Sequence, residues 1–161
     1  MISVNQFIDD YILKRCATAY LAQYELFDQI PQLKEDILIP DYCFAGDDEN
    51  IVVNAWFGPC GTVSPLHFDP DHNFLCQVVG RKYIRLYDAS HSSLLYPHDG
   101  FLSNTSRIDV ENPDLNQFPD FLSVPYVECI LDEGSMLYLP PRMWHYVKSL
   151  SVSFSVSFWW K

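Results

Sequence analysis

The sequence predicts an all-β core, a double-stranded β-helix or jelly roll, that follows an N-terminal helical segment. From residue 51 onward, short runs rich in β-branched and aromatic residues recur with turn residues between them. The chain has 161 residues, of which 48% are hydrophobic and 16% aromatic, so it can bury a core without disulfides or metals. We therefore expect one domain over residues 1–161.

Residues 1–50 are predicted to form a wall or lid beside the main sheet. Ser3 and Gln6 match a capping box, and Ile2 can pack on Phe7, so a helix should run from about residue 4 to 15. The other expected elements are a strand at 19–23, a helix at 26–33 that Pro31 interrupts, and a turn-rich loop whose Asp47, Asp48 and Glu49 form a solvated acidic turn.

Residues 51–161 are predicted to form the jelly roll. Hydrophobic pattern and turn residues place eight strands at 51–57, 62–67, 74–79, 82–87, 126–131, 135–139, 144–148 and 152–159. An insertion at 88–125 separates the fourth strand from the fifth, and its aromatic content favours an ordered recognition loop. The last strand alternates strictly, and its serines, from Ser151 to Ser157, face either a cavity or solvent.

Charge and cysteine content exclude several classes of protein. A net charge of −11 argues against direct binding to nucleic acid and favours a basic protein or peptide partner. Five scattered cysteines without a CxxC pair indicate neither a disulfide framework nor a zinc ribbon, which fits a reducing compartment. The sequence shows neither a membrane span nor a signal-peptide pattern, so we expect an intracellular protein without membrane association.

Three residues are candidate metal ligands. His67 and Asp69 lie two positions apart near the end of a predicted strand, so they can share a face, and His145 lies near the start of another strand. The two strands should be neighbours in a jelly roll. Two imidazoles and one carboxylate suit a non-haem Fe(II) oxygenase, since they leave positions open for a cosubstrate and dioxygen. A zinc hydrolase would use the same ligands, but no general base stands beside them.

A second group of residues could hold 2-oxoglutarate, a dianion that needs a buried cation. Lys82 alternates with Ile84 and can point inward with it, although Lys82 could instead lie on the surface while Arg81 or Arg85 faces inward. Further polar groups that could contact this cosubstrate are Tyr20, Ser64 and Asn73.

Two tryptophans and one further histidine lie near these positions. Trp56 and Trp159 fall on strands near the expected mouth of the jelly roll and could line a channel for a flat or cationic side chain. His72 follows a proline turn, and we interpret it as a surface residue.

Several segments resemble the Jumonji C (JmjC) domain of Fe(II)- and 2-oxoglutarate-dependent oxygenases, a cupin-like fold. The similarity runs nearly end to end and includes the segments Tyr-Leu-Ala-Gln at 20–23, Asn-Ala-Trp-Phe-Gly-Pro at 54–59, Gly-Arg-Lys-Tyr-Ile-Arg-Leu-Tyr at 80–87 and Ser-Phe-Ser-Val-Ser-Phe-Trp-Trp at 153–160. In this family the region before Tyr20 holds further helices and strands, whereas only nineteen residues precede Tyr20 here, which favours a fragment or a shortened form.

The resemblance implies that His67, Asp69 and His145 bind Fe(II), and that Tyr20, Ser64, Asn73 and Lys82 contact 2-oxoglutarate. It also implies that Trp56 and Trp159 line the substrate channel, and that the protein is nuclear, with the cytoplasm as the alternative. We expect hydroxylation of a protein side chain, arginine in the first place. The alternatives are demethylation of histone N-methyl-lysine by the same chemistry, and a non-catalytic JmjC binding module.

Overall fold

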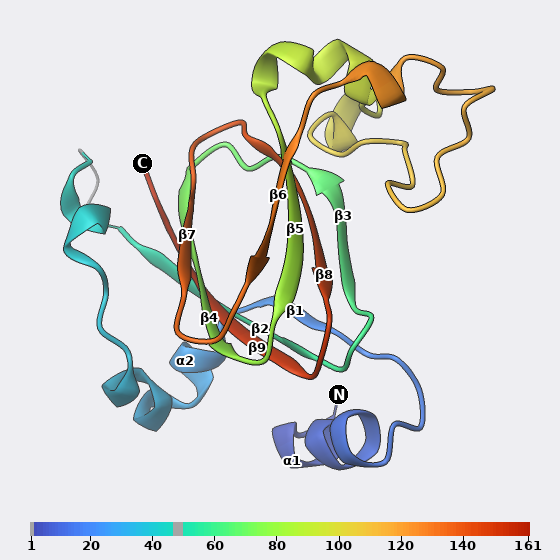
Figure 1. The fold of residues 1–161 in the computed structure, drawn as a ribbon. Helices are drawn as coiled ribbons and strands as arrows, with labels where there is room; N and C mark the ends of the chain where they lie inside the picture. The colour runs from blue at the N-terminus through green and yellow to red at the C-terminus, as the bar shows by residue number, and fades with distance from the viewer. Residues whose placement is uncertain (1, 47–49) are drawn as a thin grey trace.

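Two antiparallel sheets face each other in the computed structural model, which describes residues 2–46 and 50–161 (Figure 1). The first sheet has the order β1-β2-β9-β4-β7, and the second has the order β3-β8-β5-β6. The strands are β1 (Leu21–Tyr24), β2 (Val52–Gly58), β3 (Val63–His67), β4 (His72–Val79), β5 (Lys82–Tyr87), β6 (Val127–Leu131), β7 (Met136–Leu139), β8 (Trp144–Ser149) and β9 (Ser153–Trp160).

The predicted jelly roll is confirmed, because all eight strands expected after residue 50 form and each end lies within two residues of its predicted position. The acidic turn predicted at residues 47–49 lies outside the described residues. No helix in the described part of the chain is long and apolar enough to cross a membrane.

The N-terminal helix forms where the sequence predicts it, but most of it is not α-helical. Ser3 caps α1 (Val4–Phe7) by accepting a hydrogen bond from the Gln6 N–H, as the capping box predicts. The α-helix continues as a π-helix at Ile8–Leu13, so the helix expected at about 4–15 forms, but it ends at Leu13 and only its first turn has α-helical hydrogen bonds. The Phe7 ring packs on Phe57 of β2 at 5.6 Å between centroids, which holds this helix against the first sheet.

The second helix is split at Pro31, as predicted. It comprises α2 (Leu26–Gln29) and a 3-10 helix at Pro31–Asp36, because proline has no N–H with which to continue the α-helical hydrogen bonds. The remaining helical segments are single 3-10 stretches at Asp41–Phe44, Ala89–Leu95, Gly100–Leu102 and Phe121–Ser123.

Apolar side chains form three layers around and between the sheets. The outer face of the first sheet packs on the N-terminal segment, where Phe158 and Trp160 of β9 meet Leu26 and Phe27 of α2. A smaller cluster fills the space between the sheets. The outer face of the second sheet is covered by the insertion between β5 and β6 through a third cluster, whose buried members are Leu66, Tyr87, Leu95, Ile108, Val110, Phe118, Phe121, Val124, Trp144 and Tyr146.

The serines of β9 face inward. Ser153, Ser155 and Ser157 are buried, and Gln77 of β4 connects two of them. Its Nε2 donates to Ser153 Oγ at 2.8 Å, and its Oε1 accepts from Ser155 Oγ at 2.7 Å. The alternating pattern did not say whether these serines face a cavity or solvent. The structure shows that they face the interior, which is polar at this point.

Candidate metal and cosubstrate site

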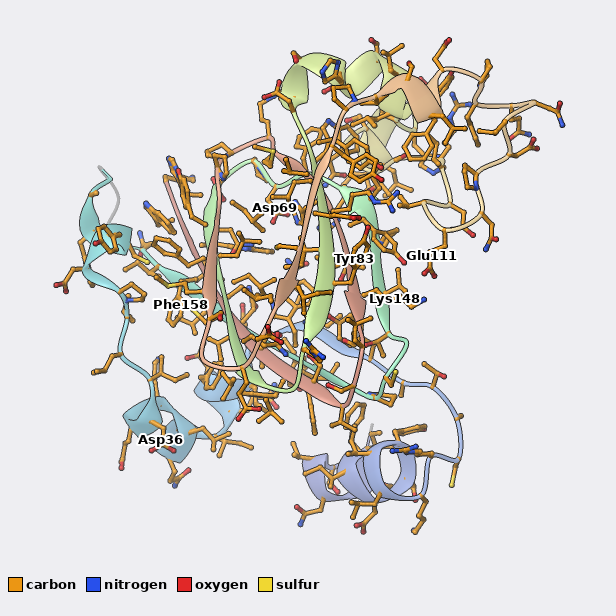
Figure 2. All side chains as sticks on the ribbon, in the orientation of Figure 1. Asp36, Asp69, Tyr83, Glu111, Lys148 and Phe158 are labelled. Atoms are coloured by element: carbon orange, nitrogen blue, oxygen red, sulfur yellow. The ribbon has the colours of Figure 1, made fainter. Side chains whose placement is uncertain are left out.

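The three candidate ligands meet between the sheets. His67 ends β3 and lies directly opposite His145 of β8, while Asp69 follows just beyond β3. Asp69 Oδ1 lies 3.9 Å from His67 Nε2, and Asp69 Oδ2 lies 3.7 Å from His145 Nε2. One ligand atom from each residue falls within 4.8 Å of the other two, which is a spacing that a single metal ion can bridge. Figure 2 shows Asp69 inside the barrel, toward the end on which the insertion lies.

A β-bulge in β3 brings Ser64 and His67 to the same side. Residues three apart on a regular strand point to opposite faces, but the pairing of β3 with β8 shifts register between Ser64 and His67. Both side chains therefore face the cavity, whereas Leu66 packs into the outer cluster. Two residues of β3, Pro65 and Leu66, lie opposite the single residue Tyr146 of β8, and Pro65 has no N–H to contribute to the ladder.

The two imidazoles are oriented with Nε2 toward the carboxylate. His67 Nδ1 lies 2.7 Å from the Pro65 carbonyl oxygen, and His145 Nδ1 lies 2.9 Å from that of Met143. A carbonyl only accepts, so each Nδ1 carries the hydrogen and each Nε2 keeps a free lone pair. Burial, with a smaller contribution from nearby His67, lowers the pKa of His145 to about 3, which keeps this imidazole neutral and able to bind a metal.

The pKa of Asp69 depends on its burial and on two neighbours, His67 and Asn73. Burial raises the pKa of Asp69, while His67 and a hydrogen bond from Asn73 act in the opposite direction. Asn73 is itself buried, and its Oδ1 has no hydrogen-bond partner among the described residues. An unpartnered acceptor beside a carboxylate is costly when buried, so this position favours an additional ligand or water.

Lys82 supplies a buried cation to the same cavity. Its side chain is 1% exposed, and burial lowers its pKa to about 8. Nζ lies 3.4 Å from the Tyr20 hydroxyl, and no ion pair with Lys82 is found in residues 2–46 and 50–161. Burial raises the pKa of Tyr20, and a hydrogen bond with Ser64 partly offsets that effect. Lys82 thus has a hydroxyl but no carboxylate as its partner.

One cavity collects nearly all the candidate residues. Its lining comprises Tyr20, Trp56, Ser64, His67, Asp69, Asn73, Leu75, Lys82, Leu139, His145 and Val147. Trp56 is fixed by its indole N–H, which donates to Ser157 Oγ at 2.8 Å. Sequence reasoning missed the apolar lining from Leu75, Leu139 and Val147. The alternation of side chains along β4, β7 and β8 is the sequence signal that could have identified them.

The residues present suit both an Fe(II) ion and 2-oxoglutarate. The donor set of two imidazoles and one carboxylate fits Fe(II), and the uncompensated ammonium of Lys82 fits the distal carboxylate of a dianion.

Comparison with known proteins then identifies the family. Residues 3–161 match the family described as "Cupin-like domain". The chain belongs to this cupin-like family. It is 59% identical over 165 residues to lysine-specific demethylase 8 from Danio rerio, with 99% of this chain and 41% of that protein covered.

Two further relatives share this resemblance. The chain is 57% identical over 142 residues to lysine-specific demethylase JMJ30 from Arabidopsis thaliana, with 88% of this chain and 33% of that protein covered. It is 52% identical over 146 residues to Jumonji C domain-containing protein 5 from Drosophila melanogaster, with 88% and 36% covered. The resemblance to JmjC proteins is thereby confirmed, and the cupin-like domain spans well under half the length of these relatives.

Two residues of the cupin-like domain differ from their expected surroundings. Trp159 is half-buried on the inner face of β9, next to Asn73 of β4, but does not line the cavity. Its Nε1 is buried and has no partner among the described residues. His72 lies on the outer face as expected, yet it is half-buried rather than exposed. Its ring lies nearly parallel to those of Tyr138 and Trp160, and its Nδ1 lies 2.6 Å from the Tyr138 hydroxyl.

Proposed function

We propose that this cupin-like domain is an Fe(II)- and 2-oxoglutarate-dependent oxygenase that acts on a protein side chain. The observation that carries the proposal is the meeting, in one cavity, of the His67–Asp69–His145 cluster and the buried ammonium of Lys82. Either feature alone has ordinary structural explanations. Together they provide separate binding groups for a divalent metal and for a dianion, which a non-catalytic binding module would not need.

In this proposal each residue has a defined task. His67 and His145 bind Fe(II) through Nε2, because their Nδ1 atoms are already hydrogen-bonded to backbone carbonyls. Lys82, Tyr20 and Ser64 bind the distal carboxylate of 2-oxoglutarate, and Asn73 holds the Asp69 carboxylate in orientation. When bound, Fe(II), 2-oxoglutarate and dioxygen supply the oxidising power that inserts one oxygen atom into a substrate C–H bond, with release of succinate and carbon dioxide. The surrounding apolar side chains exclude water from that step.

For the substrate, the names of the relatives favour N-methyl-lysine over the arginine preferred from the sequence alone. Two relatives that cover most of this chain are named lysine-specific demethylases. Hydroxylation of an N-methyl group gives a product that loses formaldehyde, so demethylation requires no residue beyond those of a hydroxylase. The net charge of −11 suits a basic protein segment in either case, and we propose action on such proteins in the nucleus.

Mass spectrometry of paired peptides tests the reaction type. The protein, Fe(II) and 2-oxoglutarate are incubated with one peptide that carries N-methyl-lysine and a matched peptide that carries arginine in its place. Loss of the methyl group from the first peptide, with formaldehyde released, is the expected result. If only the arginine peptide reacts, and gains one oxygen atom, the proposed reaction is arginine hydroxylation and not demethylation. Succinate that forms at the same rate with wild type and with a His67→Ala variant would overturn the enzyme proposal.

A further inference from the structure

Phe68, the residue between the candidate ligands His67 and Asp69, is held by an asparagine from the insertion. The backbone N–H of Phe68 donates to the Asn104 carbonyl oxygen at 2.9 Å. The side-chain Nδ2 of Asn104 donates in turn to the Phe68 carbonyl oxygen at 3.1 Å. Asn104 therefore forms hydrogen bonds with both the N–H and the carbonyl oxygen of Phe68. Phe68 lies between His67 and Asp69 in the sequence.

The segment around Asn104 is fixed on both of its sides. On one side Thr105 forms a bridge to His67, and the Ser106 N–H donates to the Leu66 carbonyl oxygen at 2.8 Å. On the other side Pro97 bridges to Ser106. Residues 104–106 thus extend the second sheet beyond the edge of β3. The Thr105 hydroxyl also lies 3.4 Å from Asn104 Oδ1, which leaves Nδ2 as the group that faces Phe68.

Asp69 depends on these contacts because it lies outside the strand. β3 ends at His67, so the regular ladder with β8 does not reach Asp69. Two attachments hold the peptide there: Asn104 on Phe68, and the Arg142 N–H, which donates to the Asp69 carbonyl oxygen at 2.8 Å. Arg142 belongs to the turn that leads into β8 and His145. The carboxylate must stay close to two Nε2 atoms at once, so a small rotation of this peptide would move it off one of them.

We propose that Asn104 is a positioning residue of the metal site, which fixes the Phe68 peptide and so sets, together with the hydrogen bond from Asn73, the direction of the Asp69 carboxylate. The inference rests on the proposed function, since it concerns the same ligands. It assigns part of the insertion to the site although Asn104 does not line the cavity. Groups that orient metal ligands without touching the metal typically change metal affinity by about 10- to 100-fold when they are removed.

Mn(II), a redox-stable probe of the same ligands, tests the inference by titration calorimetry and electron paramagnetic resonance. Asn104→Ala removes the side-chain donor but keeps the backbone bond from Phe68, so the fold should persist. Asn104→Asp keeps the shape and replaces the donor by an acceptor. The control is Asn116→Ala, an exposed asparagine of the same insertion. All proteins are measured below the melting temperature of the least stable one.

Both Asn104 variants should bind Mn(II) about 10- to 100-fold more weakly and give an altered Mn(II) spectrum, while Asn116→Ala matches wild type. Folded Asn104 variants with wild-type affinity and spectrum would reduce Asn104 to a purely structural role and overturn the inference. The two proposals fail in different arms of the experiment: absence of Mn(II) binding by wild type itself would overturn the metal site, and the positioning role with it.

Discussion

Replacement of Lys82 by methionine is expected to stabilise the metal-free protein while it abolishes turnover of 2-oxoglutarate. Methionine has a similar length and remains apolar, so it can fill the space of the lysine stem without bringing a charge into the interior. The ammonium group that is removed belongs to a side chain that is 1% exposed, and it lies 3.4 Å from the Tyr20 hydroxyl. Removal of a buried charge that lacks a counter-ion should favour the folded state.

The size of the effect follows from the pKa. Burial lowers the pKa of Lys82 from 10.5 to about 8, and this difference corresponds to about 3 kcal/mol at any pH below both values. Between pH 8 and 10.5 the unfolded state binds more protons than the folded state, so wild-type stability rises with pH in this window. The advantage of Lys82→Met should therefore be largest at neutral pH and shrink as the pH approaches 10.5.

Urea unfolding of both proteins at pH 7 and pH 10, without metal or cosubstrate, measures this difference. Lys34→Met serves as control, because the Lys34 side chain is 58% exposed and its ion pair with Asp28 contributes little. 2-Oxoglutarate with a divalent metal should stabilise wild type, and Lys82→Met should lose most of that effect together with succinate formation. A Lys82→Met protein that is less stable than wild type by the same amount at both pH values would refute the reasoning.

Three further outcomes are expected. Gly80→Ala should strongly lower the stability of the fold in thermal unfolding, because a Cβ there would lie 2.0 Å from the Val152 carbonyl oxygen. Gly134→Ala, which has a similar positive φ but lies in open space, should cost only about 1–2 kcal/mol in the same assay. Ser157→Ala should cost about 1–3 kcal/mol in urea unfolding, because it leaves the Trp56 indole N–H unpaired; an equal loss on mutation of exposed Ser93 would contradict this. Mn(II) at 100 times its dissociation constant should raise the free energy of unfolding of wild type by about 2.7 kcal/mol, and EDTA should reverse this gain. An equal stabilisation of His145→Ala by Mn(II) would contradict the proposed metal site.

Local sequence patterns predicted the strands, and together with the family resemblance they pointed to most of the side chains that line the cavity. Alternation places Lys82 and Ile84 on the same face of their strand, and the short spacing of His67 and Asp69 keeps both near one strand end. The same patterns do not say which face of a strand is buried. For β9 that choice depends on Gln77, which lies on another strand and binds two of the serines.

Long-range contacts account for most of what the sequence did not predict. The half-buried position of His72 depends on Tyr138 and Trp160, which come from β7 and β9. The link from Asn104 to Phe68 combines one backbone hydrogen bond with one from the Asn104 side chain across 36 positions, and such a link leaves no local pattern. The change from α- to π-helix after Phe7 likewise has no signal in the capping box, which defines where the helix begins but not how it continues.

The central claim is that His67, Asp69 and His145 hold a catalytic Fe(II) beside 2-oxoglutarate. Its most direct test is the rate of succinate formation by the purified protein with Fe(II), 2-oxoglutarate and dioxygen, compared with the His67→Ala variant and with a His91→Ala control from the insertion. Wild type and His91→Ala should form succinate at similar rates, and His67→Ala should form none above the rate without protein. Equal rates in wild type and His67→Ala would contradict the claim.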